Sequence, residues 1–207
     1  MHFYNGFLYV CDFGAGQILK ISPDGSSEVL IEGWEGKRFS RPNDIIADKK
    51  GNLWFSDPNA YGKGIRDGRL FKYHLESQTL TLVLDSLAFP NGLAISKDGN
   101  DLYLAESALE SVFRWKIGKD GALYEKTLLL ELPGGDPDGL EIDRFGNILI
   151  AHFGGGAIFI ISPTGKILKK IATPGKKPTN LEIVGKKRGR RYLILSEAET
   201  NSLYRLK

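Results

Sequence analysis

Four short segments of the chain place asparagine or aspartate beside a proline. The polar residues follow Pro42, Pro90 and Pro137 directly, and follow Pro178 after one threonine. Amide and carboxylate oxygens are the ligands that hard cations such as Ca²⁺, Mg²⁺ and Mn²⁺ prefer. If the fold brings the four segments together, the sequence therefore predicts an oxygen-rich site for a divalent cation.

The same tripeptides have a purely structural interpretation. Pro-Asn-Gly and Pro-Asp-Gly are common turn sequences, and their polar side chains can cap their own backbone. A single occurrence would be read as a turn. Recurrence at one position of a repeat favours a functional site instead, because it places the polar side chains around a common axis.

The four segments open a longer repeat. Each has a proline, a short polar pair, an apolar strand, a glycine-bearing turn and a second apolar strand. Successive prolines are 48, 47 and 41 residues apart, a spacing typical of β-propeller blades. The aligned segments are RPNDIIADKKGNLWFSDP from Arg41, FPNGLAISKDGNDLYLAES from Phe89, DPDGLEIDRFGNILIAHFG from Asp136 and KPTNLEIVGKKRGRRYLILSEA from Lys177.

Further strands complete each unit. Third strands rich in aromatic and β-branched residues are indicated at Arg69, Ser111, Ala157 and Ser202, and fourth strands at Thr79, Tyr124 and Lys166. An earlier unit has strands from Phe7, Gln17 and Ser26. The sequence predicts an all-β fold, a single β-propeller domain over 1–207 with about five blades of four antiparallel strands. The units are approximately 1–38, 39–86, 87–133, 134–174 and 175–207.

The ends of the repeat do not complete a circle. The last unit stops at its third strand, and the first begins partway through its innermost strand. A closed propeller normally joins both termini in one blade. Three arrangements stay open: five blades that close on themselves, an incomplete ring, and a ring completed by another chain. Unpaired edge strands would favour a homo-oligomer.

Two sets of residues should converge on one face of such a propeller. One set precedes the innermost strands and the other ends the second strands. Asp57, Glu106, His152 and Asn180 are further pocket candidates, although a histidine there more often packs and loop carboxylates are more often solvated. The full sets are Arg41, Asn43, Asp44, Asn91, Asp138, Thr179 and Asn180, and Asp12, Asp57, Glu106, His152 and Glu197.

Composition excludes several other classes. The net charge of +3 is too small to indicate nucleic-acid binding, and the single cysteine, Cys11, excludes an intrachain disulfide framework. No apolar run reaches membrane-spanning length, and the first ten residues do not look like a secretion signal. We expect a protein of the cytoplasm that binds neither nucleic acid nor membrane.

These segments together resemble the gluconolactonase family, also called senescence marker protein 30 or regucalcin-like, which consists of six-bladed propellers. The resemblance runs over essentially the whole chain and is strongest in EGKRFSRPNDIIADKKGNLWFSDPNAYG, PNGLAISKDGNDLYLAE and PDGLEIDRFGNILIAHFGGG. It implies that Asn91 and Asp138 are metal ligands and that Asp138 is also the general base. It implies that Arg41 and Asn43 contact the substrate, and that Asn43 also lies in the metal site.

One family feature has no counterpart. The family's remaining protein ligand is a glutamate in a Glu-Gly-Pro sequence on the first blade, and no such tripeptide precedes Phe7. The chain therefore resembles the second to sixth blades of the family. The resemblance implies a divalent-metal-dependent hydrolase of sugar lactones or small esters, with Ca²⁺ as the expected ion and Mg²⁺, Mn²⁺ or Zn²⁺ as alternatives. A non-catalytic binding propeller or an inactive truncated member remains the alternative hypothesis.

Overall fold

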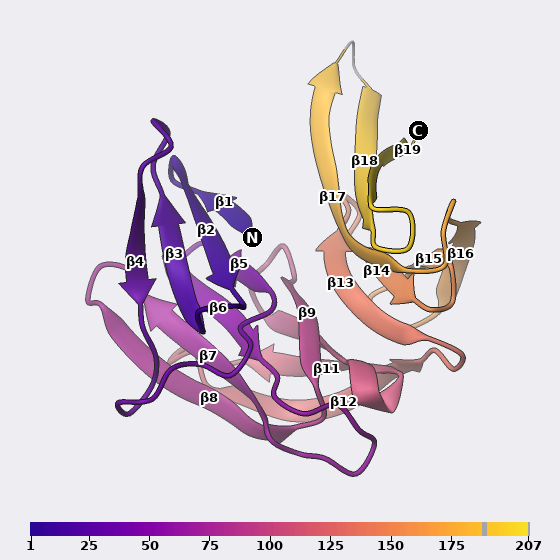
Figure 1. The fold of residues 1–207 in the computed structure, drawn as a ribbon. Coiled ribbons are helices and arrows are strands. Elements are labelled where there is room, and N and C mark those ends of the chain that lie inside the picture. The colour runs from indigo at the N-terminus through magenta and orange to yellow at the C-terminus, as the bar shows by residue number, and fades with distance from the viewer. Residues whose placement is uncertain (188–189, 207) are drawn as a thin grey trace.

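Five antiparallel sheets follow one another around an arc in the computed structural model, which describes residues 1–187 and 190–206 (Figure 1). The first sheet contains β1 (His2–Tyr4), β2 (Phe7–Asp12), β3 (Gln17–Ile21) and β4 (Ser27–Ile31). The second contains β5 (Ile45–Ala47), β6 (Asn52–Asp57), β7 (Gly68–His74) and β8 (Thr79–Leu87).

The remaining sheets repeat this order. The third contains β9 (Pro90–Ile95), β10 (Asp101–Glu106), β11 (Ser111–Ile117) and β12 (Leu123–Glu131), and the fourth contains β13 (Asp136–Ile142), β14 (Ile148–Phe153), β15 (Ala157–Ile161) and β16 (Ile167–Ala172). The fifth has three described strands, β17 (Pro178–Lys187), β18 (Arg190–Glu197) and β19 (Ser202–Leu206). Each sheet is a meander in sequence order, so the predicted all-β propeller blades are confirmed.

The hairpin between the first two strands has the same construction in the second and fourth blades, where an aspartate accepts hydrogen bonds from two backbone N–H groups of the turn. In the second blade, Oδ1 of Asp48 accepts hydrogen bonds from the backbone N–H groups of Lys50 and Asn52. Gly51 supplies the left-handed residue, with φ of 80°, which a residue with a side chain adopts only with strain. The predicted turn glycines Gly51, Gly99 and Gly146 all have this left-handed conformation, and the corresponding turn of the last unit includes residues 188–189, which lie outside the described residues.

The hydrophobic core lies between neighbouring sheets. One buried cluster joins the first and second sheets through Ile18, Phe39 and Phe55, and another joins the second and third through Trp54 and Leu93. Two further clusters join the third sheet to the fourth and the fourth to the fifth. Each blade is therefore stabilised by its neighbours, as expected of a repeat in which one unit cannot bury its own apolar faces.

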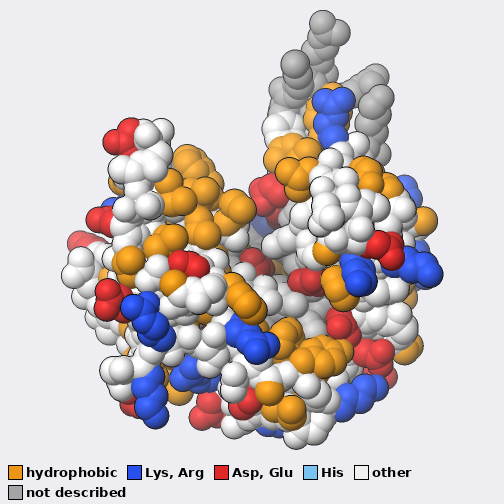
Figure 2. Space-filling view, viewed as in Figure 1, with side chains coloured by type: hydrophobic (Ala, Val, Ile, Leu, Met, Phe, Trp, Pro, Cys, Tyr) orange, Lys and Arg blue, Asp and Glu red, His pale blue; other side chains and the backbone are white. Residues whose placement is uncertain are grey.

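The first and last sheets face each other across an opening. The N-terminus lies beside it in Figure 1, and the surface is hollowed between these two sheets in Figure 2. None of the buried clusters in the described ranges joins the fifth sheet to the first. The five blades in the described residues thus form an open arc and do not close on themselves, whereas an incomplete ring and a ring completed by another chain both stay open.

Helix is almost absent from the described part of the chain. Its one helical element is the three-residue 3₁₀ turn η1 (Ser107–Leu109). No helix in residues 1–187 and 190–206 has the length and apolar character needed to cross a bilayer.

Candidate functional site

The inner strands bring the predicted polar residues to one face. Contacts between β5 and β9, β9 and β13, and β13 and β17 line these strands up around the centre of the arc. Asn91 and Asp138 occupy equivalent places near the starts of β9 and β13. Asp44 lies just before β5, and Asn180 lies near the start of β17.

The glycine after each polar residue allows the inner strands to approach closely. A Cβ on Gly92 would collide with the backbone oxygen of Asp138, and one on Gly139 would collide with the side chain of Asn180. Both glycines lie within strands, so the interpretation of these tripeptides as turns is wrong. The glycines serve instead to bring Asn91, Asp138 and Asn180 together.

Asn91 presents an oxygen with no protein partner. The residue is buried, with 7% of its surface exposed, and its Oδ1 atom has no hydrogen-bond partner among the described residues. A buried carbonyl oxygen without a partner costs about 1–3 kcal/mol. Native proteins tolerate such a cost mainly where the atom has a ligand to bind.

Asp138, on the neighbouring strand, is partly buried and crowded by other acids. Burial is the main reason that the pKa of its carboxyl lies well above the ordinary value, and the negative charges of Asp44 and Asp136 raise it further. A hydrogen bond from the side-chain amide of Asn91 acts in the opposite direction. No positive charge in the described part of the chain is among the causes that shift the pKa of Asp138, whereas the N-terminal ammonium lowers the pKa of nearby Asp44.

Asp44 ties two inner strands together beneath these residues. Only 5% of its surface is exposed, and its Oδ2 accepts a hydrogen bond of 3.1 Å from the backbone N–H of Leu93 in the next blade. Burial raises the pKa of its carboxyl. The sequence placed Asp44 on this face, but it carried no signal that the side chain would bind the neighbouring blade.

Arg41 and Asn43 lie on the same face, between the first and second blades. The Arg41 guanidinium lies over the ring of Phe13, 5.8 Å from its centroid. Asn43 is partly buried, and its backbone N–H donates to the carbonyl oxygen of Ser56. Their roles toward substrate or metal stay predictions.

Asp57, Glu106 and His152 lie in the walls of the blades. Asp57 accepts hydrogen bonds from the backbone N–H of Arg41 and from the Arg69 guanidinium, at 2.7 and 2.6 Å. Glu106 likewise accepts bonds from the Ala88 N–H and the Lys126 ammonium, at 2.7 and 2.6 Å.

The His152 ring is 3% exposed and lies 3.0 Å from the carbonyl oxygen of Leu132, measured from Nε2. A carbonyl only accepts, so Nε2 carries the proton. Nδ1 is then left as an acceptor without a partner among the described residues. The ring packs edge-on against Phe159.

Tyr61 crosses the site face from the loop after β6. Its hydroxyl donates a 2.9 Å hydrogen bond to Oδ1 of Asp136, and its ring packs edge-on against Phe89, with 5.2 Å between centroids. Burial and the Asp136 carboxylate raise the pKa of Tyr61 to about 12. Since Phe89 and Asp136 precede Asn91 and Asp138, Tyr61 spans the two segments that carry the site. No motif in the sequence indicated this contact.

The donor set fits one hard cation. Asn91 offers the unpartnered amide oxygen, and Asp138 offers a carboxylate whose ionised form a positive charge would favour. Within the described residues, His, Cys, Asp and Glu side chains do not gather into a group of three or more suited to a metal. Any protein ligand set in this part of the chain therefore depends on amide oxygens as well as carboxylates.

Five antiparallel blades around a common centre, with Asn and Asp side chains at the starts of their inner strands, define the protein as a β-propeller. A family model described as SMP-30/gluconolactonase/LRE-like region matches residues 24–197. The chain belongs to this family. Its members include lactonase-type hydrolases.

A curated gluconolactonase from Zymomonas mobilis is 31% identical over 197 residues, which cover 85% of this chain and 54% of that protein. A solved gluconolactonase structure from Xanthomonas campestris has a TM-score of 0.80 at 26% identity, covering 93% of this chain and 66% of that one. The structure of a calcium-binding protein, regucalcin, from Agrobacterium tumefaciens has a TM-score of 0.80 at 18% identity, covering 95% and 66%, and is a likeness of fold. The chain thus spans about half the length of the curated gluconolactonase.

Proposed function

We propose that this protein is a divalent-cation-dependent hydrolase of sugar lactones or related small esters. The observation that carries the proposal is the unpartnered Oδ1 of Asn91 beside the crowded carboxyl of Asp138. The lactonase relatives of the family support the substrate class. Ca²⁺ is the preferred ion because the donors are oxygens, and the calcium-binding relative agrees with that choice. Mg²⁺, Mn²⁺ and Zn²⁺ are the alternatives.

In this proposal Asn91 and Asp138 hold the cation together with Asn43. When bound, it supplies a Lewis acid that polarises the lactone carbonyl and stabilises the oxyanion of the tetrahedral intermediate. Arg41 and Asn43 orient the sugar hydroxyls. The buried inner strands on either side keep the two ligand-bearing segments rigid, which positions the substrate relative to Asp138.

Asp138 acts as the general base. The oxygen of a water molecule attacks the carbonyl carbon while the carboxylate accepts a proton from that water. Cleavage of the ring C–O bond releases an alkoxide, which takes the proton back from Asp138. The products are a hydroxy acid and the regenerated carboxylate, so atoms and charges balance.

The test is hydrolysis of glucono-δ-lactone by metal-free protein, before and after addition of Ca²⁺, Mn²⁺ or Zn²⁺. The Asp138→Asn and Asn91→Ala proteins should lose the metal-stimulated rate. Asp85→Asn is a matched control, since Asp85 is exposed on the outermost strand β8. Equal rates in the Asp138→Asn and Asp85→Asn proteins would exclude the proposal.

A binding propeller without catalysis is the second candidate, and the opening between the first and fifth sheets favours it. In the described part of the chain no blade lies on one side of the site, so the site would enclose a substrate less completely than a closed ring does. Calorimetric titration with Ca²⁺ separates the two candidates. Binding of the ion without turnover of any lactone would favour the second.

Self-association through the fifth sheet is part of the proposal. The outer edge of β19 pairs with no other strand among the described residues, and β19 carries Leu203 with 76% of its surface exposed. An unpaired edge of this kind is a template for pairing with a second copy. Light scattering should report a dimer, and a stable monomer at micromolar concentration would contradict this part of the proposal.

A further inference from the structure

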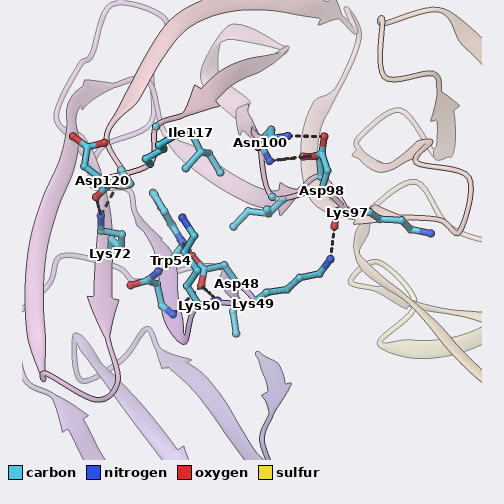
Figure 3. Close-up of a pocket in the computed structure, with 18 residues that line it drawn as sticks. Asp48, Lys49, Lys50, Trp54, Lys72, Lys97, Asp98, Asn100, Ile117 and Asp120 are labelled. Atoms are coloured by element: carbon cyan, nitrogen blue, oxygen red, sulfur yellow. Dashed lines mark hydrogen bonds between the residues drawn. The ribbon is translucent and has the colours of Figure 1, made fainter.

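A lysine-rich pocket lies on the face opposite the candidate site. It has a volume of about 360 Å³ and lies between the second and third blades (Figure 3). Three hairpin turns form its rim, those that follow β5, β9 and β11. The candidate site lies where the inner strands start, whereas these turns lie at the far ends of β5 and β9. The two sites are therefore separated by the length of the inner strands.

The lining of this pocket carries an excess of positive charge. Five lysines and three aspartates contribute to it. The lysines are Lys49, Lys50, Lys72, Lys97 and Lys119, and the aspartates are Asp48, Asp98 and Asp120. If all eight are ionised, two positive charges are left over. The whole chain has a net charge of only +3, so positive charge is concentrated here.

Two of the three aspartates of the pocket, Asp48 and Asp98, accept several hydrogen bonds within their own turns, and Asp120 accepts one from the backbone N–H of Ala122. Asp48 accepts hydrogen bonds from two backbone N–H groups, from the Asn52 amide and from the Trp54 indole. Asp98 accepts bonds from Ser96 and Asn100. Hydrogen bonds of this kind favour the ionised form of a carboxyl but use up its acceptor capacity. These carboxylates therefore compete weakly for the lysine ammonium groups.

Two ammonium groups are fixed in place without a counterion. Lys72 Nζ donates to the backbone oxygens of Asp120 and Gly121, at 3.4 and 3.2 Å, and lies 5.4 Å from the centre of the Trp54 ring. Lys49 Nζ donates to the backbone oxygen of Lys97. Neither forms an ion pair with a carboxylate in the part of the chain that the structure describes.

Donors remain on both groups. An ammonium has three N–H bonds, so the carbonyl contacts leave one on Lys72 and two on Lys49. Figure 3 shows the two side chains on opposite sides of the pocket, with Ile117 on the wall between them and Lys97 pointing away. Gly121 leaves the room that the Lys72 ammonium occupies, because a Cβ at that position would collide with Nζ.

We propose that this pocket binds a small phosphorylated molecule that carries an anionic group at each end. One phosphate would accept hydrogen bonds from Lys72 and the other from Lys49. The carbon skeleton between them would lie against Ile95 and Ile117. Lysine binds phosphate as a point charge, and the cavity has the size of a site for a small ligand. The pocket is independent of the proposed lactone site.

The test is calorimetric titration of metal-free protein with fructose 1,6-bisphosphate, inorganic phosphate and succinate, after any chelator has been removed by gel filtration. The bisphosphate should bind at least tenfold more tightly than inorganic phosphate or succinate. Affinity should fall about tenfold when sodium chloride is raised from 50 to 300 mM, because the contacts are between charges. Succinate binding as tight as that of the bisphosphate would overturn the assignment to phosphate.

Lys72→Gln and Lys49→Gln should each weaken bisphosphate binding about tenfold, and Lys72→Arg should retain it. Lys166→Gln is the matched control, because Lys166 is an exposed residue in a hairpin turn on the same face of the fourth blade. Circular dichroism checks that each variant folds. If Lys166→Gln weakens bisphosphate binding as much as the pocket variants do, the bisphosphate binds to the positive surface in general, and the proposal is overturned. Asp138→Asn should leave this binding unchanged, which separates it from the lactonase proposal.

Discussion

Two sets of polar side chains meet on the site face, and they differ in what they bind. The carboxylates that end the second strands are hydrogen-bonded within their own blades, whereas His152 at the equivalent position keeps an Nδ1 atom without a partner among the described residues. Asp57, Glu106 and Glu197 each accept a hydrogen bond from a backbone N–H just before the inner strand of the same blade. The residues near the starts of the inner strands are less satisfied, and Oδ1 of Asn91 has no partner among the described residues.

This difference shows how to distinguish polar residues that recur because they stabilise each blade from polar residues that recur because they form a binding site. Both sets recur from the second blade to the fifth, so recurrence alone does not tell them apart. A carboxylate that closes its own blade has a complete structural explanation. A buried oxygen left without a partner does not, and it is the better guide to a binding site.

The largest expected effect is on catalysis and comes from the inner-strand set. Asp138→Asn keeps the shape of the side chain but removes the base, so the rate of lactone hydrolysis should fall about 10²- to 10⁴-fold. The same change should raise stability at neutral pH by about 0.5–2 kcal/mol, because it removes a buried acid whose charge is disfavoured. Initial rates and urea unfolding measure the two effects. If the Asp138→Asn protein is less stable than the parent, Asp138 stabilises the fold as the second-strand carboxylates do, which contradicts the distinction between the two sets.

Substitutions among the residues that end the second strands should instead reduce the stability of the fold. Asp57 is fully buried and pairs with Arg69, which is itself partly buried. Asp57→Ala leaves that guanidinium and the Arg41 N–H without their acceptor, and we expect a loss of about 3 kcal/mol in the free energy of unfolding. Urea denaturation provides the measurement.

Asp67→Ala is a control, because Asp67 is exposed and its hydrogen bonds lie within a surface loop. Its loss of stability should be under about 1 kcal/mol. If Asp57→Ala instead folds as stably as the parent and loses only activity, Asp57 belongs with the inner-strand set.

The sequence was sufficient for the fold because its signals are local and repeated. The glycine of the first hairpin turn in each blade and the alternation of apolar residues predicted the strands, and the prolines predicted the inner-strand starts. The partners of the polar residues are distant in sequence and so could not be predicted. Leu93, for example, donates to Asp44 from 49 residues away. The site residues could be assigned to one face, but which of them were already satisfied required the structure.

A third expected effect is on the pH dependence of stability, and it comes from two glutamates that lie further along the inner strands than the site residues. Glu141 on β13 and Glu182 on β17 lie beside each other in the central channel. Burial, and then the charge of Glu182, raise the pKa of Glu141 to about 7. The folded state therefore holds a proton more tightly than the unfolded chain does. Stability is greatest below the ordinary glutamate pKa and is lost as pH rises through about 7.

Glu141→Gln should remove most of this dependence and gain about 1–2 kcal/mol at pH 8. Urea unfolding at pH 5 and pH 8 measures it, with Glu76→Gln as an exposed control. If the Glu141→Gln protein shows the same difference in stability between pH 5 and pH 8 as the parent, the Glu141–Glu182 pair does not cause the pH dependence. That result would also leave Asp44 and Asp138, whose pKa values are both raised, as the acids to be tested.

The smallest expected effect concerns Tyr61 of the second blade. Its hydroxyl donates a hydrogen bond to the carboxylate of Asp136, at the start of an inner strand in the fourth blade. Tyr61→Phe removes the hydrogen bond to Asp136 and keeps the packing against Phe89. Stability should fall by about 0.5–1 kcal/mol, since the bond is exposed to solvent. The pKa of Asp136 should rise further, because Tyr61 now lowers it. Lactone hydrolysis should change less than about threefold, as expected for a residue that positions a loop. Steady-state kinetics provides the measurement. If Tyr61→Phe instead loses as much activity as Asn91→Ala, the Tyr61 hydroxyl belongs with the groups that touch the substrate.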